Sequence, residues 1–177
     1  MAARLVSAHE GGRRVVGVVS AMGTTTDQLV ALATDVSPRP HPREMDMLLS
    51  TGERIACALV AMAITDLGQE ALSLTGSQAG IITDGTHMKA KIREIRGDRV
   101  RDALDEDKIV LVAGFQGFSR DTMDVTTLER AQAGDGTVHV AFTFHRRAIK
   151  HLRVPLAALA GGFDRLCAFT SVRPSQP

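Results

Sequence analysis

The chain has 177 residues, of which 44% are hydrophobic and 23% charged, so it predicts one globular domain rather than a disordered chain. A net charge of +1 gives no reason to expect a polyanionic partner, and 3% aromatic residues argue against a stacking surface for nucleic acid. Cys57 and Cys167 lie far apart in apolar segments, which favours buried thiols in a reducing cytoplasm over a disulfide or a metal pair. No apolar run reaches the roughly 18 residues that a membrane helix needs, so we expect a cytoplasmic protein without a membrane partner.

The N-terminal part predicts a strand followed by two helices. Residues 14–20 form a β-branched run without polar alternation, typical of a strand buried on both faces of a parallel sheet. A turn and the N-cap candidates among residues 24–27 then predict a helix with an apolar side, formed by Leu29, Val30, Leu32 and Ala33. After a Pro-rich loop, residues 43–67 predict a long helix, in which Gly52 indicates a break or a tight approach.

The following segments alternate between strands and one helix. Strands are expected at residues 71–74, 81–84, 92–95 and 108–113, and a helix at residues 98–106 with Asp98 as its N-cap candidate. This alternation predicts an α/β fold with a mostly parallel sheet.

The pattern of polar and apolar residues changes after Thr127. A polar linker (129–136), a half-buried strand (138–144) and a helix interrupted by Pro155 (146–159) are expected there. The strand at residues 138–144 was expected to cover an open edge of the sheet. We therefore divide the chain into residues 1–128 and a divergent segment, residues 129–177, that completes or caps the same domain.

Five segments resemble segments of aspartate kinases, in the same order and at similar spacing: SAMGTTTDQL (20–29), REMDMLLSTGERI (43–55), LTGSQAGIITDGTH (74–87), RDALDEDKIVLVAGFQG (101–117) and DVTTL (124–128). The resemblance implies the amino-acid-kinase (carbamate-kinase-like) fold, a three-layer αβα sandwich, here incomplete because the family's first strand is absent. It also implies ATP-dependent phosphorylation of L-aspartate to 4-phospho-L-aspartate in the biosynthesis of lysine, threonine and methionine, with Mg²⁺ screening the phosphates.

The same resemblance implies four residues that bind aspartate. Ser20 ends the first predicted strand, where ligands bind in open parallel sheets, although a serine that bonds its own turn is the alternative. Thr26 reads as an N-cap and as an aspartate-binding hydroxyl, and the two roles are compatible. Glu53 is expected to hold the amino group of aspartate, or else to pair with a nearby arginine such as Arg54. Arg130 matches an arginine that grips a substrate carboxylate, or it is an exposed linker residue.

Further residues are expected to shape the pocket walls, and they lie in or near the Gly-containing turns of the motifs, including TGER (51–54) and TGSQAG (75–80): Gly23, Gly52, Ser77 and Gln116. His87 follows the second of these turns and is a further candidate. No catalytic residue and no metal ligand is assigned, because the histidines lack metal-ligand spacing.

The chain departs from the family pattern where the family holds phosphate. Aspartate kinases open with Lys-Tyr-Gly-Gly-Ser, whereas this chain has no Lys before Lys89 and no Tyr. After DVTTL the family continues with Gly-Arg-Gly-Gly-Ser-Asp, and here the run 129–134 keeps Arg130 in register without the glycine pair. Because phosphoryl transfer depends on positioning and electrostatic stabilisation, a weak or inactive kinase is expected. The alternative is a catalytically dead module that binds aspartate or pairs with a full-length kinase subunit or with itself.

Overall fold

The computed structural model describes residues 1–128, together with the backbone of residues 137–144 and 148–155. Within these ranges the elements follow in the order α1 (Ala2–Glu10), β1 (Val16–Val19), α2 (Thr25–Val36), α3 (Pro42–Asp66), β2 (Ala71–Leu74), β3 (Ile81–Thr83), β4 (Ile92–Ile95), α4 (Asp98–Asp105), β5 (Ile109–Ala113), β6 (Gln116–Ser119), β7 (Val125–Thr127), β8 (Thr137–Phe144) and β9 (Ala148–Pro155).

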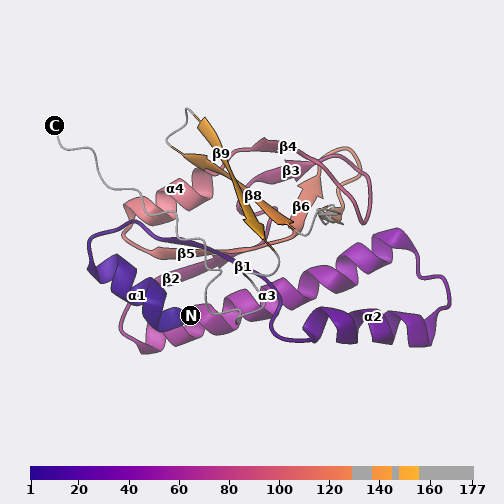
Figure 1. The fold of residues 1–177 in the computed structure, drawn as a ribbon, viewed down its shortest axis with the longest axis horizontal. Helices are drawn as coiled ribbons and strands as arrows, with labels where there is room; N and C mark the ends of the chain where they lie inside the picture. Colours follow the sequence, from indigo (N-terminus) through magenta and orange to yellow (C-terminus); the bar gives the residue numbers. More distant parts are fainter. Residues whose placement is uncertain (129–136, 145–147, 156–177) are drawn as a thin grey trace.

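A parallel three-stranded sheet with the order β1-β5-β2 forms the centre of the fold (Figure 1). Both outer strands run parallel to β5, with Val16 opposite Val110 on one side and Ala71 opposite Ile109 on the other. Every residue of β5 is buried, as expected of a central strand covered on both faces. The strands predicted from the apolar runs at residues 14–20, 71–74 and 108–113 are thereby confirmed. The expectation that the first of them is buried on both faces is wrong, because Val18 of β1 is 69% exposed.

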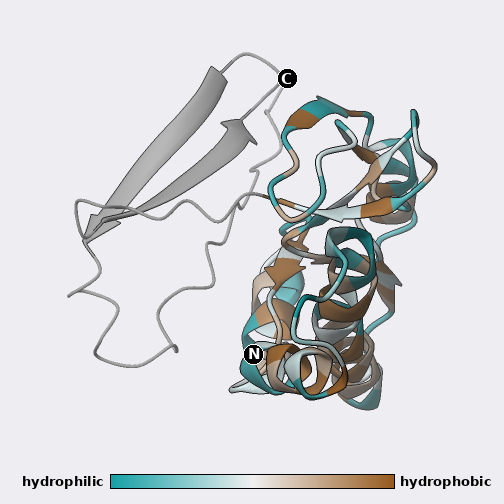
Figure 2. Ribbon diagram, turned by 90° about the vertical axis from the view of Figure 1, so that its right-hand side faces the viewer, coloured by the Kyte–Doolittle hydropathy of each residue, from teal (hydrophilic) through white to brown (hydrophobic). Residues whose placement is uncertain are grey.

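Helices cover both faces of this sheet. On one face α1 and α3 pack against it through buried residues that include Leu5, Ile64 and Leu111. On the other face Ala103 of α4 joins Leu74 and other buried side chains. Figure 2 shows helices that carry both apolar and polar residues, the composition of amphipathic helices that cover a core. The three-layer αβα arrangement and the mostly parallel sheet are therefore confirmed.

A second, mixed sheet has the order β4-β3-β6-β7 and lies beside the first half of α3 (Figure 1). Here β3 pairs antiparallel with β4 and parallel with β6, and β6 pairs antiparallel with β7. Sequence analysis predicted β3 and β4 but missed β6 and β7, because both strands are short and their buried positions hold polar side chains such as Gln116 and Thr126. It also missed α1, whose N-cap position makes no side-chain cap hydrogen bond.

Helix α3 runs without interruption through Gly52, so the predicted break and the predicted turn at TGER are wrong. The predicted tight approach is confirmed: a β-carbon at Gly52 would lie 3.0 Å from the β-carbon of Ala21. Glycine at this position therefore lets another segment come close to the helix backbone, while tertiary packing overrides its weak helix propensity.

Length and composition alone would allow α3 to cross a membrane, since an 18-residue window has a mean hydropathy of 1.6. This corrects the expectation that no apolar run is long enough. The core helix of a globular domain passes the same test. Here α3 buries Ala56, Cys57 and Ile64 against the parallel sheet and also buries Asp46 and Glu53. These contacts account for its apolar composition as that of a core helix.

Helix α2 lies alongside α3 and is the least buried of the described helices (Figure 1). None of its residues is buried, and on its predicted apolar side Leu32 is 58% exposed while Leu29 and Ala33 are partly covered. The predicted N-cap of α4 is also corrected, because Gly97 occupies that position with φ +65° and Asp98 is the first helical residue.

Beyond residue 136 the predicted strand is confirmed and the predicted helix is wrong. Strand β8 pairs antiparallel with β9, from Thr137 opposite Pro155 to Phe144 opposite Ala148. The expected helix is thus a strand, consistent with Pro155, which cannot stand inside a regular helix. Within the described backbone β8 pairs with β9 alone, so the expectation that it covers an edge of the main sheet is wrong. The division at residue 128 stays a prediction.

Candidate functional site

The carboxyl ends of β1, β5 and β2 meet at one edge of the parallel sheet, which is where ligands bind in open sheets of this kind. Ser20 follows β1, Gly114 follows β5 and Thr75 follows β2. The first two connections touch, because the Gly114 amide donates a hydrogen bond of 2.9 Å to the carbonyl oxygen of Val19. We refer to this region as the carboxyl edge.

Helix α3 brings Gly52 and Glu53 next to the connection between β1 and α2. A β-carbon at Gly52 would lie 3.0 Å from that of Ala21 and 3.6 Å from Cγ2 of Thr25. Glu53 is only 5% exposed. A carboxylate is therefore buried on the helix that faces the first turn of α2, where the helix dipole is positive.

Thr26 lies in this first turn of α2 and is partly buried. The prediction that it caps the helix is wrong. Thr24 occupies the N-cap position without a side-chain cap hydrogen bond, and the hydroxyl of Thr25 donates to the carbonyl oxygen of Met22 at 2.7 Å. The hydroxyl of Thr26 is thus not used as a helix cap. Gly23 has a φ of +52°, which explains glycine in this turn.

The turn after β2 forms a second wall of the edge. The hydroxyls of Thr75 and Ser77 lie 2.9 Å apart, and Ser77 is exposed. Gly76 is buried against the carbonyl of Gln116, and a β-carbon at Gly76 would overlap that oxygen. The turn therefore packs directly on the first residue of β6.

Gln116 joins this wall to α3. Its side chain is 1% exposed, and its Nε2 donates to the carbonyl oxygen of Ser50 at 3.0 Å. The Nε of Arg54 donates in turn to Oε1 of Gln116 at 3.4 Å. Gln116 is thus a buried bridge between the second sheet and α3, and its predicted role in shaping the pocket stays a prediction.

The structure places most of the predicted site residues on segments that contact one another at the carboxyl edge: Ser20, Gly23, Thr26, Gly52, Glu53, Ser77 and Gln116. Arg130 lies outside the described residues. The assignment of these residues to aspartate binding stays a prediction.

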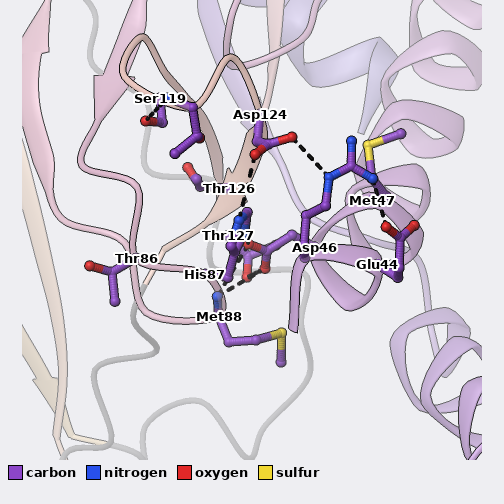
Figure 3. Close-up of polar contacts among 12 residues, drawn as sticks. Glu44, Asp46, Met47, Thr86, His87, Met88, Ser119, Asp124, Thr126 and Thr127 are labelled. Carbon is purple, nitrogen blue, oxygen red and sulfur yellow. Dashed lines mark hydrogen bonds and ion pairs between the residues drawn. The ribbon is translucent and has the colours of Figure 1, made fainter. Parts of the chain in front are cut away.

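Sequence analysis missed a buried polar cluster near the N-terminus of α3 (Figure 3). Asp46 has no exposed surface, and its carboxylate accepts hydrogen bonds from the amide of Met88 at 3.0 Å and from the hydroxyl of Thr127 at 2.5 Å. The Nδ1 of His87 lies 2.6 Å from Oδ2 of Asp46. Donors from the loop between β3 and β4 and from β7 therefore converge on one carboxylate of α3.

The cluster continues outward through Asp124. Its Oδ2 lies 3.7 Å from Nε2 of His87, and its Oδ1 accepts a hydrogen bond of 2.9 Å from Nε of Arg43. The hydrogen bond from Arg43 holds the pKa of the Asp124 carboxyl below its usual value. His87 was noted only as an isolated candidate, whereas the structure places it between two carboxylates.

One signal in the sequence could have revealed this cluster. Arg43, Asp46, Ser50 and Arg54 recur at intervals of three and four residues, so they share one face of an otherwise apolar helix. Each of them bonds to the second sheet or its connecting loops through its side chain or its carbonyl. We name these four residues the polar stripe of α3.

Cys57 is a buried thiol of α3, 2% exposed. Burial, with the nearby charge of Glu53, raises the pKa of this thiol to about 11. It is therefore protonated at neutral pH, which makes it a weak nucleophile.

Three lysines lie within residues 1–128, at positions 89, 91 and 108. Lys108 precedes β5 at the end of the strand opposite the carboxyl edge, and Lys89 and Lys91 line a separate polar cavity of about 280 Å³ with Asp84 and Thr86. Among residues 1–128 and the described strands beyond them, no group of three or more His, Cys, Asp or Glu residues is placed to hold a metal ion.

Comparisons with known proteins agree with this geometry. The model of the amino acid kinase family matches residues 1–135. The chain is 61% identical to an aspartokinase of Mycolicibacterium smegmatis over 141 residues, which are 80% of this chain and 34% of that protein. It is 49% identical to an aspartokinase of Geobacillus stearothermophilus, covering 85% of this chain and 36% of that protein.

A solved structure shows the same likeness in three dimensions. The aspartate kinase from Synechocystis superimposes with a TM-score of 0.60 at 48% identity, over 73% of this chain and 21% of that protein. The chain spans about a third of the length of the curated relatives that it matches.

Proposed function

Because the chain belongs to the amino acid kinase family, we propose that its carboxyl edge is the aspartate-binding part of an aspartate kinase catalytic site. The substrate is L-aspartate, and the reaction of the whole enzyme is its ATP-dependent phosphorylation to 4-phospho-L-aspartate. High identity to aspartokinases over the matched residues supports this choice of substrate among amino acid kinases.

The single observation that carries the proposal is the burial of Glu53, which is 5% exposed and directly follows Gly52, the residue at which α3 approaches Ala21 and Thr25. A buried carboxylate is stabilised by an ammonium group, which L-aspartate supplies through its amino group. A carboxylate of the same ligand would then lie at the positive end of the α2 dipole, within reach of the hydroxyls of Ser20 and Thr26. An amino acid with a second carboxylate meets both requirements.

ATP and Mg²⁺ belong to the proposed reaction, but the described residues do not form a phosphate site. Phosphoryl transfer needs cations and backbone donors aimed at the phosphate oxygens. Lys108 precedes β5 at the end of the strand opposite the carboxyl edge, and among residues 1–128 and the described strands beyond them no group of three or more His, Cys, Asp or Glu residues is placed to hold a metal ion. We therefore assign no step of phosphate binding to the described part of the chain.

The same observation favours a second candidate function, an aspartate-binding module without kinase activity. Such a module would bind aspartate through Ser20, Thr26, Glu53 and Arg130, and it would associate with a full-length kinase subunit or with itself. The two candidates differ in one respect, since both bind aspartate and only the first turns over ATP.

Calorimetric titration of L-aspartate into the full chain tests the proposal. We expect binding heat that is lost in Glu53→Gln, which keeps the shape of the side chain and removes its charge. Glu94→Gln is the matched control, because Glu94 is exposed on β4 and pairs with Arg96 at the surface. Absence of aspartate heat in the unmodified chain would refute the proposal.

Release of ADP from MgATP in the presence of aspartate separates the two candidates. A kinase releases ADP only when aspartate is present, and Glu53→Gln abolishes this dependence. Aspartate binding without ADP release assigns the chain to the non-catalytic candidate.

A further inference from the structure

We propose that Asp46 is a positioning residue: by accepting hydrogen bonds from His87, Met88 and Thr127, it sets the position of α3 along its axis and thereby places Glu53 at the carboxyl edge. The inference rests on the proposed function, in which Glu53 holds the amino group of aspartate.

Directional contacts surround the carboxylate of Asp46. The amide of Met88, the hydroxyl of Thr127 and Nδ1 of His87 lie between 2.5 and 3.0 Å from its two carboxylate oxygens. They come from the loop between β3 and β4 and from β7, and Figure 3 shows them around the same carboxylate. Hydrogen bonds to a charged acceptor are short, directional and stronger than those between neutral groups.

Asp46 and Glu53 are connected through the backbone of one helix, α3. Asp46 and Glu53 are seven residues apart on one uninterrupted helix, which is about 10 Å along the axis at 1.5 Å per residue. A shift of the helix at Asp46 is therefore passed on to Glu53. The carbonyl of Ser50, which accepts from Gln116, lies between them and provides a second fixed point.

The contacts between α3 and the parallel sheet are of a different kind, because they are apolar. Against the parallel sheet it packs through Ala56, Cys57 and Ile64. Apolar contacts are non-directional, so they hold a helix on a sheet more firmly than they fix its position along the axis. The polar stripe supplies the directional contacts that this packing lacks, and Asp46 is its most buried charged member.

Asp46→Asn tests the inference, because it keeps the size of the side chain and removes the charge that draws the donors together. Thr83→Val is the matched control. Thr83 is buried in the same sheet, and its hydroxyl bonds to that of Thr126 within the sheet rather than to a residue of α3. Both variants are made in the full chain with Cys167→Ser, so that Cys57 is the sole thiol.

Two measurements are made on each variant. Calorimetry gives the Kd for L-aspartate, and we expect it to rise about tenfold in Asp46→Asn. Reaction of Cys57 with a soluble aromatic disulfide at fixed pH reports on the seating of α3 without any ligand, and we expect its rate to rise about tenfold. The melting temperature of each variant shows whether the two substitutions destabilise the fold to a similar degree.

The inference holds if Asp46→Asn changes both quantities while Thr83→Val, at a similar melting temperature, changes each by less than about twofold. It is overturned if Asp46→Asn leaves both within about twofold, or if Thr83→Val changes them equally. If the unmodified chain binds no aspartate, the proposed function fails, and the thiol rates alone decide whether Asp46 seats α3. Should Asp46→Asn not fold, His87→Gln takes its place, with an expected change of about threefold.

Discussion

The two sheets of this molecule are held to α3 in different ways. Buried apolar side chains cover both faces of the parallel sheet β1-β5-β2, with Leu111 and Val110 on opposite sides of its central strand. Between α3 and the mixed sheet β4-β3-β6-β7, buried polar residues make the hydrogen bonds: Asp46 with Thr127, and Ser50 with Gln116. The same helix therefore contacts one sheet by apolar packing and the other by hydrogen bonds.

This difference indicates that the two sheets contribute differently, one through apolar burial and the other through directional hydrogen bonds. Apolar burial supplies most of the free energy of folding and has no preferred direction. Buried hydrogen bonds add little net stability, but they are costly to break and they fix geometry. We infer that the parallel sheet stabilises the domain, whereas the mixed sheet determines where the residues of α3 lie.

The largest loss of stability is expected from a substitution in the core of the parallel sheet. Leu111→Ala removes a side chain with no exposed surface and leaves a cavity between β5 and the helices α1 and α3. The free energy of unfolding should fall by about 2–5 kcal/mol, measured by urea denaturation. Leu32→Ala, at a position that is 58% exposed on α2, should change it by less than about 1 kcal/mol. Equal losses of unfolding free energy in the two variants would contradict the inference that the parallel sheet stabilises the domain.

The next largest loss of stability is expected where the turn after β2 meets the start of β6. Gly76→Ala places a β-carbon on the carbonyl oxygen of Gln116, so one of the two backbones has to move. We expect a loss of about 1–3 kcal/mol in urea denaturation, the usual range for overpacking. In Gly11→Ala the nearest atoms would lie 3.4 Å from the new carbon, and the loss should be negligible.

A loss of stability of similar size is expected within the mixed sheet. The hydroxyls of Thr83 and Thr126 lie 2.6 Å apart and are buried. Thr83→Val leaves the hydroxyl of Thr126 without this partner, which should cost about 1–3 kcal/mol in urea denaturation. The double variant with Thr126→Val should recover most of that loss, because both polar groups are then removed. A double variant that is as unstable as the sum of the two single ones would show that this pair is held by something other than its hydrogen bond.

The smallest effect concerns the exposed end of the polar stripe. Arg43 holds the pKa of Asp124 below its usual value of 3.8, so their contact stabilises the fold above that value. As the pH falls through the lowered pKa, Asp124 takes up a proton and this contribution is lost. The urea midpoint of the unmodified protein should therefore exceed that of Arg43→Gln at neutral pH, and the gap should close in acid. Because the pair is partly exposed, added salt should also narrow the gap.

Much of the parallel sheet could be predicted from the sequence, because its strands are apolar runs such as residues 109–113 and its helices have a regular apolar period. The mixed sheet was predicted only in part. Strands β6 and β7 bury Gln116, Ser119, Thr126 and Thr127, and polar residues carry no signal of burial until their partners are known. At Gly52 the sequence allowed a helix break or a tight approach, and the structure shows the tight approach.

The candidate site was predictable to a similar degree. The resemblance to aspartate kinases named Glu53 and Ser20. The parallel strands explain why Ser20 lies at the carboxyl edge, whereas Glu53 is brought there by α3. Asp46 and Asp124 were not predicted, because their partners are up to 81 residues away in the sequence. The polar residues of α3 at intervals of three and four were the one local sign of these contacts.

The most direct test of the account compares two ligands that differ only in the amino group. L-aspartate and succinate carry the same two carboxylates, so calorimetric titration of each into the full chain isolates the role assigned to Glu53. We predict that L-aspartate binds, that succinate binds at least tenfold more weakly, and that Glu53→Gln removes the difference. Equal binding of the two ligands to the unmodified chain would contradict the account.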